Sequence, residues 1–134
     1  MDEKCRFAVP KRLRDQFDEK LQNLYVAPGT DRSLDLYSES AFEVLANRVA
    51  AQSPTRADIR NYKRLFYGRA ERVDLDSQGR IRIPDRLVAF ANLQKEIVLI
   101  GVHDHVEVWD AATWQAFLDK HNTDFDTMAA GAFE

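Results

Sequence analysis

The chain has 134 residues, of which 45% are hydrophobic and 31% charged, a composition that excludes disorder of the whole and suits one ordinary domain or two small ones. Its net charge of -3 is unevenly spread, since residues 1–14 hold five basic and two acidic side chains and residues 56–86 hold nine and five, so local regions can attract phosphate. No stretch is apolar enough for a membrane span or a signal peptide, and the single cysteine excludes an internal disulfide, so we expect a cytoplasmic protein.

The first half begins with a charged turn at 2–5, followed by a short strand and a Pro10 that precedes basic residues. Apolar residues predict strands at 24–27 and 34–37 and a helix over 41–51. Ser53-Pro54-Thr55 marks a break after this helix, and Thr55 can cap a basic helix from Arg56 to about Phe66.

In the second half, residues 73–75 and 81–83 alternate apolar and polar side chains, which predicts a β-hairpin around the turn Asp-Ser-Gln-Gly. Pro84 suits position N1 of a short helix that runs to Asn92. Strands are expected at 96–101 and 106–109, separated by a turn at 103–105. Asp110 can cap a helix with Trp114, Phe117 and Leu118 on its apolar face, and the acidic tail 121–134 is expected to fray.

The two halves repeat each other. Residues 2–13 align with residues 76–87 at a constant offset of 74, and share Asp, Arg, Pro, Arg and Leu. Residues 24–27 then match 98–101, and with two residues of slippage 34–37 match 106–109. Each half therefore has the same predicted order of elements.

The repeated turn suggests a reader of DNA. Gly79 allows a positive backbone angle, Asp76 can bind turn amides, and Arg80 and Arg82 project from the same face of the strand. A two-stranded ribbon fits the major groove, where an arginine can bind guanine O6 and N7. The alternative is a surface strand that two arginines keep soluble, or an Arg80–Asp76 pair that only holds the turn.

In the first half, Arg6 and Lys4 occupy the equivalent turn. Lys11, Arg12 and Arg14 follow it, and they form either the solvated side of a helix or a phosphate-binding cluster. Cys5 stands at the glycine position, which predicts a strained and rearranged turn.

The segment from Arg64 to Pro84 (RLFYGRAERVDLDSQGRIRIP), the duplicated Asp-x-x-x-Arg-x-x-x-Pro and the later VLIGV and VEVWD segments resemble the MraZ family of bacterial transcriptional regulators over residues 2 to about 120. The halves are similar to AbrB-type (SpoVT-AbrB) modules. The resemblance implies an α+β, mainly β fold of two tandem AbrB-like swapped-hairpin units, double-psi-like, with short helices.

The resemblance also implies a ring-shaped homo-oligomer in the cytoplasm and nucleoid. It would bind double-stranded DNA at promoter direct repeats and repress its own operon of division and cell-wall genes. Arg6 and Arg80 would read bases. The full expected DNA-binding set is Arg80, Arg82, Arg6, Lys4, Gln78, Arg86 and Arg12, with Asp76, Gly79 and Pro84 shaping the turn.

We divide the chain into a first unit at 1–50, a helical linker at 51–63, a second unit at 64–120 and a flexible acidic tail at 121–134. Family members usually have about ten residues of strand before the first turn, so the first unit is expected to lack its leading strand and to leave a strand edge open. This absence and Cys5 make Arg6 a weaker candidate than Arg80.

A few side chains allow other interpretations. Cys5 between Lys4 and Arg6 could act as a redox sensor, and His103 with His105 could bind a metal, although a solvated turn without metal or cofactor is favoured. The aromatic residues could form a stacking platform, but their spacing favours core positions. These residues are Trp109, Trp114, Phe117 and Phe42.

No catalytic constellation is present in the sequence, so we expect no enzyme. Within DNA binding, the alternative is an antitoxin-like AbrB-type regulator whose acidic tail wraps a toxin. Outside it, the alternative is a ring-forming scaffold that does not bind DNA.

Overall fold

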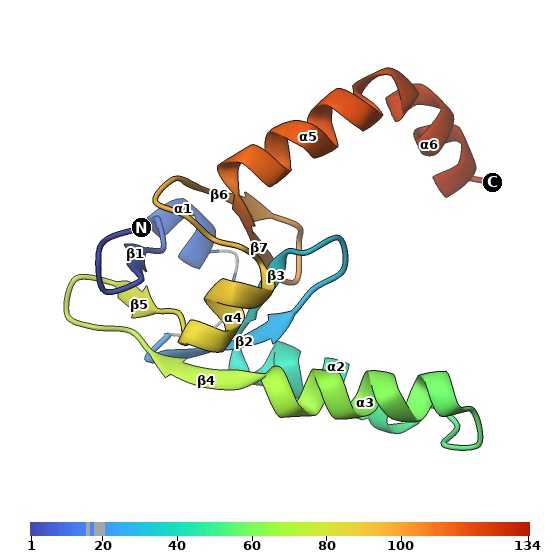
Figure 1. Cartoon of the computed structure of the whole chain (residues 1–134), viewed down its shortest axis with the longest axis horizontal. Helices are drawn as coiled ribbons and strands as arrows, with labels where there is room; N and C mark the ends of the chain where they lie inside the picture. Colours follow the sequence, from blue (N-terminus) through green and yellow to red (C-terminus); the bar gives the residue numbers. More distant parts are fainter. Residues whose placement is uncertain (16, 18–20) are drawn as a thin grey trace.

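The computed structural model describes residues 1–15, 17 and 21–134. The described elements follow in chain order: β1 (Arg6–Ala8), α1 (Lys11–Arg14), β2 (Asn23–Pro28), β3 (Leu34–Tyr37), α2 (Glu39–Ala50), α3 (Ala57–Arg69), β4 (Glu71–Asp74), β5 (Arg80–Arg82), α4 (Asp85–Phe90), β6 (Ile97–Gly101), β7 (Val106–Asp110), α5 (Ala111–His121), the 3-10 turn η1 (Asn122–Asp124) and α6 (Phe125–Ala132) (Figure 1).

The strands form a five-stranded sheet in the order β4-β2-β3-β7-β6 and a two-stranded ribbon of β1 and β5. All pairings are antiparallel. Three of them join the two halves of the sequence, namely β1 with β5, β4 with β2 and β3 with β7. The expected α+β class, with antiparallel strands and helices, is therefore confirmed.

The predicted ladder between 73–75 and 81–83 is wrong. β4 pairs with β2 in the large sheet and β5 pairs with β1 in the ribbon, so the strands on the two sides of the turn do not pair with each other. The turn is nevertheless closed, because Asp76 N–H donates to the Arg80 carbonyl at 2.9 Å and Gly79 N–H donates to the Asp76 carbonyl at 3.0 Å. Alternation defines the inner face of a strand but not its partner.

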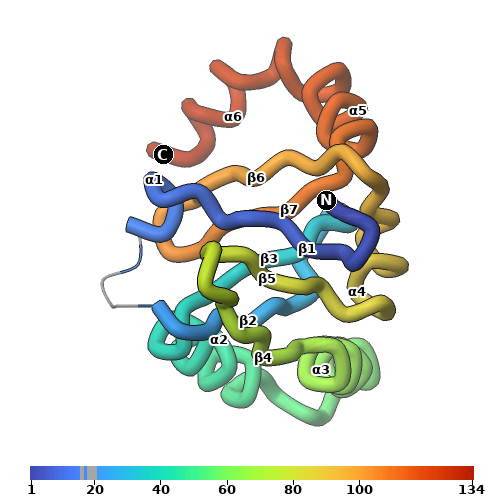
Figure 2. The backbone as a smooth tube through the Cα atoms, turned by 90° about the vertical axis from the view of Figure 1, so that its left-hand side faces the viewer, coloured from blue at the N-terminus to red at the C-terminus, as the bar shows by residue number. Residues whose placement is uncertain are grey.

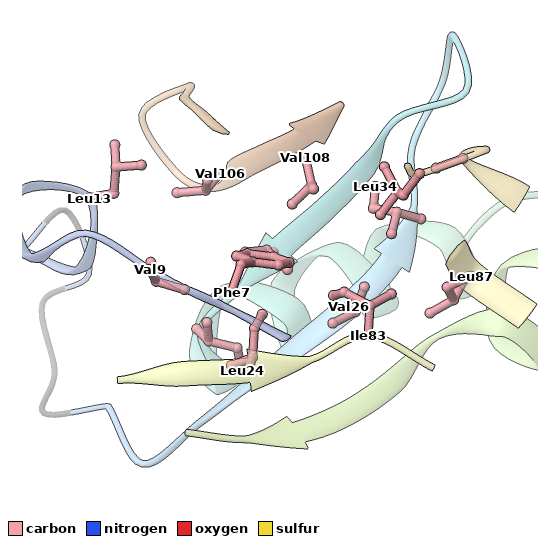
Figure 3. Close-up of a cluster of buried hydrophobic side chains, with 14 of the residues drawn as sticks. Phe7, Val9, Leu13, Leu24, Val26, Leu34, Ile83, Leu87, Val106 and Val108 are labelled. Carbon is pink, nitrogen blue, oxygen red and sulfur yellow. The ribbon is translucent and has the colours of Figure 1, made fainter. Parts of the chain in front are cut away.

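The main core lies between the ribbon and the large sheet. Figure 2 shows β1 and β5 running side by side across the large sheet. The ribbon contributes Phe7 and Ile81, and the large sheet contributes Leu24, Val26 and Val108, all with at most 8% of their surface exposed. Phe7, Leu24, Val26 and Val108 are labelled in Figure 3. Burial of this apolar surface is the dominant stabilising term and fixes the ribbon's inner face.

A second apolar cluster holds the long helices against the other part of the sheet. Phe66 on α3 is 2% exposed and packs with Ala27, Tyr37 and Val49. Phe42 on α2 stacks on Phe66 of α3, and their ring centroids lie 5.9 Å apart. Both figures place α2 and α3 side by side, away from α5 and α6 (Figures 1 and 2).

Some predictions at the helix ends need correction, and one is confirmed. Thr55 does not cap α3, because the N-cap is Arg56, which makes no side-chain cap bond, and the helix runs on to Arg69. Pro84 is the N-cap of α4 and not its first helical residue. Asp110 does cap α5, accepting from Ala112 N–H at 3.2 Å. The tail that was expected to fray contains η1 and α6.

The aromatic core prediction holds only in part. Trp109 is 4% exposed, but Trp114, Phe117 and Phe42 are half-buried because they cover the sheet from helices with one side open to solvent. Trp109 packs against Trp114 and Phe117 with both ring centroids 5.3 Å away. Among the described residues, no helix is long and apolar enough to cross a membrane.

Candidate nucleic-acid interface

The second turn is built around the Asp76 carboxylate. Its Oδ1 accepts the backbone N–H groups of Gln78 at 2.9 Å and Arg80 at 2.8 Å, and its Oδ2 accepts Nε of Arg80 at 2.8 Å. Gly79 has φ +72°, the left-handed conformation for which glycine is suited. The ion pair uses Nε of Arg80 and not its terminal nitrogens, which are donors that an arginine can offer to guanine.

The first turn has the same geometry. Asp2 Oδ1 accepts from the backbone N–H groups of Lys4 and Arg6, both at 2.9 Å, and Oδ2 accepts Nε of Arg6 at 2.9 Å. Cys5 takes φ +59° where Gly79 stands in the repeat. The expected rearrangement of this turn is therefore wrong, because the Asp2 bonds hold Cys5 in a conformation unfavourable for a residue with a Cβ.

Each turn is also bonded to the opposite strand. Ile83 N–H donates to the Cys5 carbonyl at 3.0 Å, and Val9 N–H donates to the Gly79 carbonyl at 3.1 Å. Arg6 is the register partner of Arg82, and Ala8 is that of Arg80. The two turns therefore lie at opposite ends of one short ribbon, related by the internal repeat.

The ribbon has two chemically different faces. Phe7 and Ile81 point inward and are 8% and 1% exposed. Because side chains alternate along a strand, Arg6, Arg80 and Arg82 share the outer face. Arg82 is exposed, while the Arg6 and Arg80 side chains retain 32% and 29% of their surface. Tertiary structure thus brings arginines from both halves onto one surface.

The electrostatics of the turns favour charged aspartates. Backbone N–H donation from Arg80 lowers the pKa of Asp76, and its side chain and the Gln78 N–H act in the same direction. The equivalent bonds from Arg6 lower the pKa of Asp2. Both carboxylates are therefore ionised at neutral pH and hold the arginine stems in fixed positions.

The other predicted residues are placed as follows. Lys4 and Gln78 are exposed at equivalent positions of the two turns, and Arg12 is exposed on α1. Arg86 on α4 forms an ion pair with Glu71 at 2.8 Å. This pairing partly neutralises Arg86 in the free protein.

Arg14, predicted either on the solvated side of a helix or in a phosphate-binding cluster, lies against the turn of the other half. It is half-buried and lies over the second turn, since a Cβ added at Gly79 would be 3.2 Å from its Nη1. Its Nε is buried without a hydrogen-bond partner in the described part of the chain. No local signal could reveal this contact, because the turn belongs to the other half.

The histidine prediction is correct for His103 and wrong for His105. His103 is exposed, as expected for a solvated turn. The His105 side chain is only 18% exposed and is surrounded by the carboxylates of Asp35, Asp104 and Glu107. Asp35 comes from β3 in the other half of the chain, so its position beside His105 could not be predicted from the sequence.

Comparison with known proteins gives concordant matches. The family described as "MraZ protein, putative antitoxin-like" matches residues 66–134. A "Transcriptional regulator MraZ" from Finegoldia magna is 32% identical over 98% of this chain and 90% of its own length. Namesakes from Mycoplasmoides gallisepticum and Cutibacterium acnes are each 35% identical, over 96% and 99% of this chain and 89% and 92% of their own lengths.

These relatives define the class of protein as a transcriptional regulator. Within that class the chain belongs to the MraZ family. The matches cover the first half as well as the second, so the repeat-bearing N-terminal residues are included in the likeness.

Proposed function

We propose that this protein is a sequence-specific DNA-binding regulator whose β1/β5 ribbon enters the major groove. The observation that carries the proposal is the outer face of the ribbon, where Arg6, Arg80 and Arg82 stand above an inner face buried in the core. A rigid ribbon of this kind fits the groove, and each bidentate arginine–guanine contact contributes about 1–3 kcal/mol of discrimination.

The residues divide into two roles. Arg80, Arg82 and Arg6 read base edges, and the aspartate clamps preorganise two of them so that less side-chain entropy is lost on binding. The remaining residues contact phosphates or neighbouring base edges from the turns and from α1 and α4: Lys4, Gln78, Arg12 and Arg86. Asp76, Gly79 and Pro84 shape the turn and its exit.

At the level of the whole molecule, we propose two AbrB-like swapped-hairpin units whose strands exchange across the internal repeat. Several copies form a ring, which presents many ribbons to spaced promoter direct repeats and raises their effective concentration. The regulator acts in the cytoplasm at the nucleoid and represses its own operon of division and cell-wall genes. The assembly is tested by sedimentation velocity, where a monomer at micromolar concentration would contradict it.

Fluorescence anisotropy with a duplex from upstream of the protein's own gene tests DNA binding. Arg82→Ala removes a reader without disturbing either clamp and should weaken binding roughly tenfold or more. Arg80→Ala should do the same. Arg72→Ala is the matched control, because Arg72 is an exposed arginine on β4 that pairs with Asp74 outside the ribbon.

Affinity should fall steeply as salt rises, because phosphate contacts release counterions. Equal affinity for a scrambled duplex would contradict sequence reading. Absence of any salt-sensitive binding would favour the scaffold alternative.

A second candidate function is antitoxin-like binding of a partner protein through the tail. Large apolar side chains stand exposed on and beside α6, with Phe125 70%, Met128 49% and Phe133 92% exposed. Deleting residues 122–134 should then abolish binding to the product of an adjacent gene while leaving DNA affinity intact. If the truncated chain keeps both its partner binding and its DNA affinity, this candidate is rejected.

A further inference from the structure

A cluster outside the ribbon lies where β3 and β7 meet in the middle of the large sheet (Figure 1). Asp35 and Glu107 are direct register partners across this pair, and they occupy the same position of the repeat. Facing residues in an antiparallel pair share a face, and His105, two residues before Glu107, shares it too. The fold therefore gathers three metal-ligating side chains from both halves.

The distances are those of a convergent site. His105 Nε2 lies 3.8 Å from Asp35 Oδ1 and 3.7 Å from Glu107 Oε2. One ligand atom from each residue lies within 4.8 Å of the other two. The side chains are 16% exposed for Asp35, 18% for His105 and 27% for Glu107, so the cluster is mostly withdrawn from solvent while one side stays open.

Each of the three side chains makes a second contact that orients it. This contact uses the other oxygen of the carboxylate or the other nitrogen of the imidazole, which does not face the cluster. Asp104 Oδ1 binds Nδ1 of His105 at 2.6 Å. Trp109 Nε1 donates to Glu107 Oε1 at 3.0 Å. Tyr37 Oη donates to Asp35 Oδ2 at 3.5 Å. Outer contacts of this kind, above all a carboxylate on the far nitrogen of a histidine, typically fix metal ligands in place.

One atom of the cluster lacks the partner that its burial requires. Asp35 Oδ1 is buried and has no hydrogen bond from any described residue. Glu107 directly opposite adds a second negative charge. A bound cation would satisfy the orphaned oxygen and offset this repulsion.

We propose that Asp35, His105 and Glu107 form a binding site for a divalent transition metal ion such as Zn²⁺. One imidazole and two carboxylates suit such ions, and tetrahedral ligands at about 2.0–2.2 Å require the three side chains to draw closer together than the observed spacing. Water would fill the fourth position on the open side. The ion would join β3 of the first half to β7 of the second and stabilise their pairing.

Isothermal titration of the full chain with Zn²⁺, after treatment with a chelator, tests the site. We expect one ion per chain, with affinity reduced at least tenfold in His105→Gln and in Asp35→Asn. His103→Gln is the matched control, since this neighbouring histidine is exposed. Cys5→Ser controls for binding by the lone thiol. Both controls should bind as the unaltered chain does.

Two further readouts keep the test decisive if a variant folds poorly. Circular dichroism checks the fold, and the melting temperature should rise with Zn²⁺ in the unaltered chain but not in His105→Gln. Co²⁺ should quench the fluorescence of Trp109, which contacts Glu107. Absence of saturable binding, or equal binding by the His105→Gln variant, overturns the proposal.

Discussion

Asp76 holds Arg80 at two points, since it accepts both the backbone N–H and the side-chain Nε of this residue at 2.8 Å. The clamp removes rotamer freedom from the arginine stem before any ligand is bound. Removing a negative charge should by itself strengthen DNA binding, whereas losing the clamp should weaken it. The sign of the effect therefore separates preorganisation from simple electrostatics.

We predict that Asp76→Ala lowers affinity for the duplex from upstream of the protein's own gene by roughly two- to tenfold, because the entropy of fixing Arg80 must then be lost on binding. Anisotropy at fixed salt measures this. Asp74→Ala is the control, as it deletes a neighbouring exposed carboxylate that does not bind the turn amides. Tighter binding by Asp76→Ala would contradict the clamp's proposed role.

Gly79→Ala should destabilise the fold by about 1–2 kcal/mol, because alanine is strained at φ +72° and its Cβ would lie 3.2 Å from Arg14 Nη1. Urea denaturation measures the change. Gly68→Ala is the control. It lies in α3, and apart from its own helix no atom of the described residues comes within 4 Å of an added Cβ, so Gly68→Ala should stabilise the fold by up to about 1 kcal/mol.

Acid should loosen the two turns. The pKa values of Asp2 and Asp76 lie below the ordinary value of 3.8 because of backbone N–H donation from Arg6 and Arg80. A carboxyl group whose pKa is lower in the folded than in the unfolded state stabilises the fold at pH values above its unfolded-state pKa, near pH 4. This stabilisation is lost as the pH falls through the folded-state pKa.

The free energy of unfolding should therefore fall less between pH 6 and pH 3 in Asp76→Asn than in the unaltered chain. Denaturation at both pH values gives the comparison, with Asp74→Asn as the control. An identical pH dependence in Asp76→Asn and the unaltered chain would show that Asp76 makes no pH-dependent contribution to the free energy of unfolding.

Ile81→Ala should cost about 2–5 kcal/mol, because Ile81 is 1% exposed on the inner face of the ribbon and leaves a cavity when truncated. Chemical denaturation measures this. Val44→Ala, at a site 62% exposed on α2, should change stability by less than about 0.5 kcal/mol. A cost near zero for Ile81→Ala would mean that the ribbon does not rest on the core.

Much of the local structure could be predicted from the sequence. The spacing Asp-x-x-Gly-Arg specifies a turn in which the carboxylate reaches amides two and four residues ahead, and the bonds of Asp76 agree. The equivalent turn around Asp2 follows from the repeat, although the strain expected at Cys5 did not rearrange it. The strand predicted at 34–37, which the repeat matches to residues 106–109, agrees with the observed bounds.

Partners across the chain could not be predicted. A period of two tells which side chains face inward, but it leaves open which strand lies alongside. The sequence therefore predicts a pairing of β4 with β5, whereas in the structure β4 pairs with β2 and β5 pairs with β1. The contact of Arg14 with the Gly79 turn and the meeting of Asp35 with His105 depend on that long-range pairing.

The sequence by itself determined the repeat, the two turns and the arginines that they project, because these depend on contacts within a few residues. Only the tertiary structure decided that Arg6, Arg80 and Arg82 share one surface, and that carboxylates from both halves surround His105. The physical reason is that burial of Phe7 and Ile81 against the large sheet fixes how the halves interleave, and this burial is a property of the whole core.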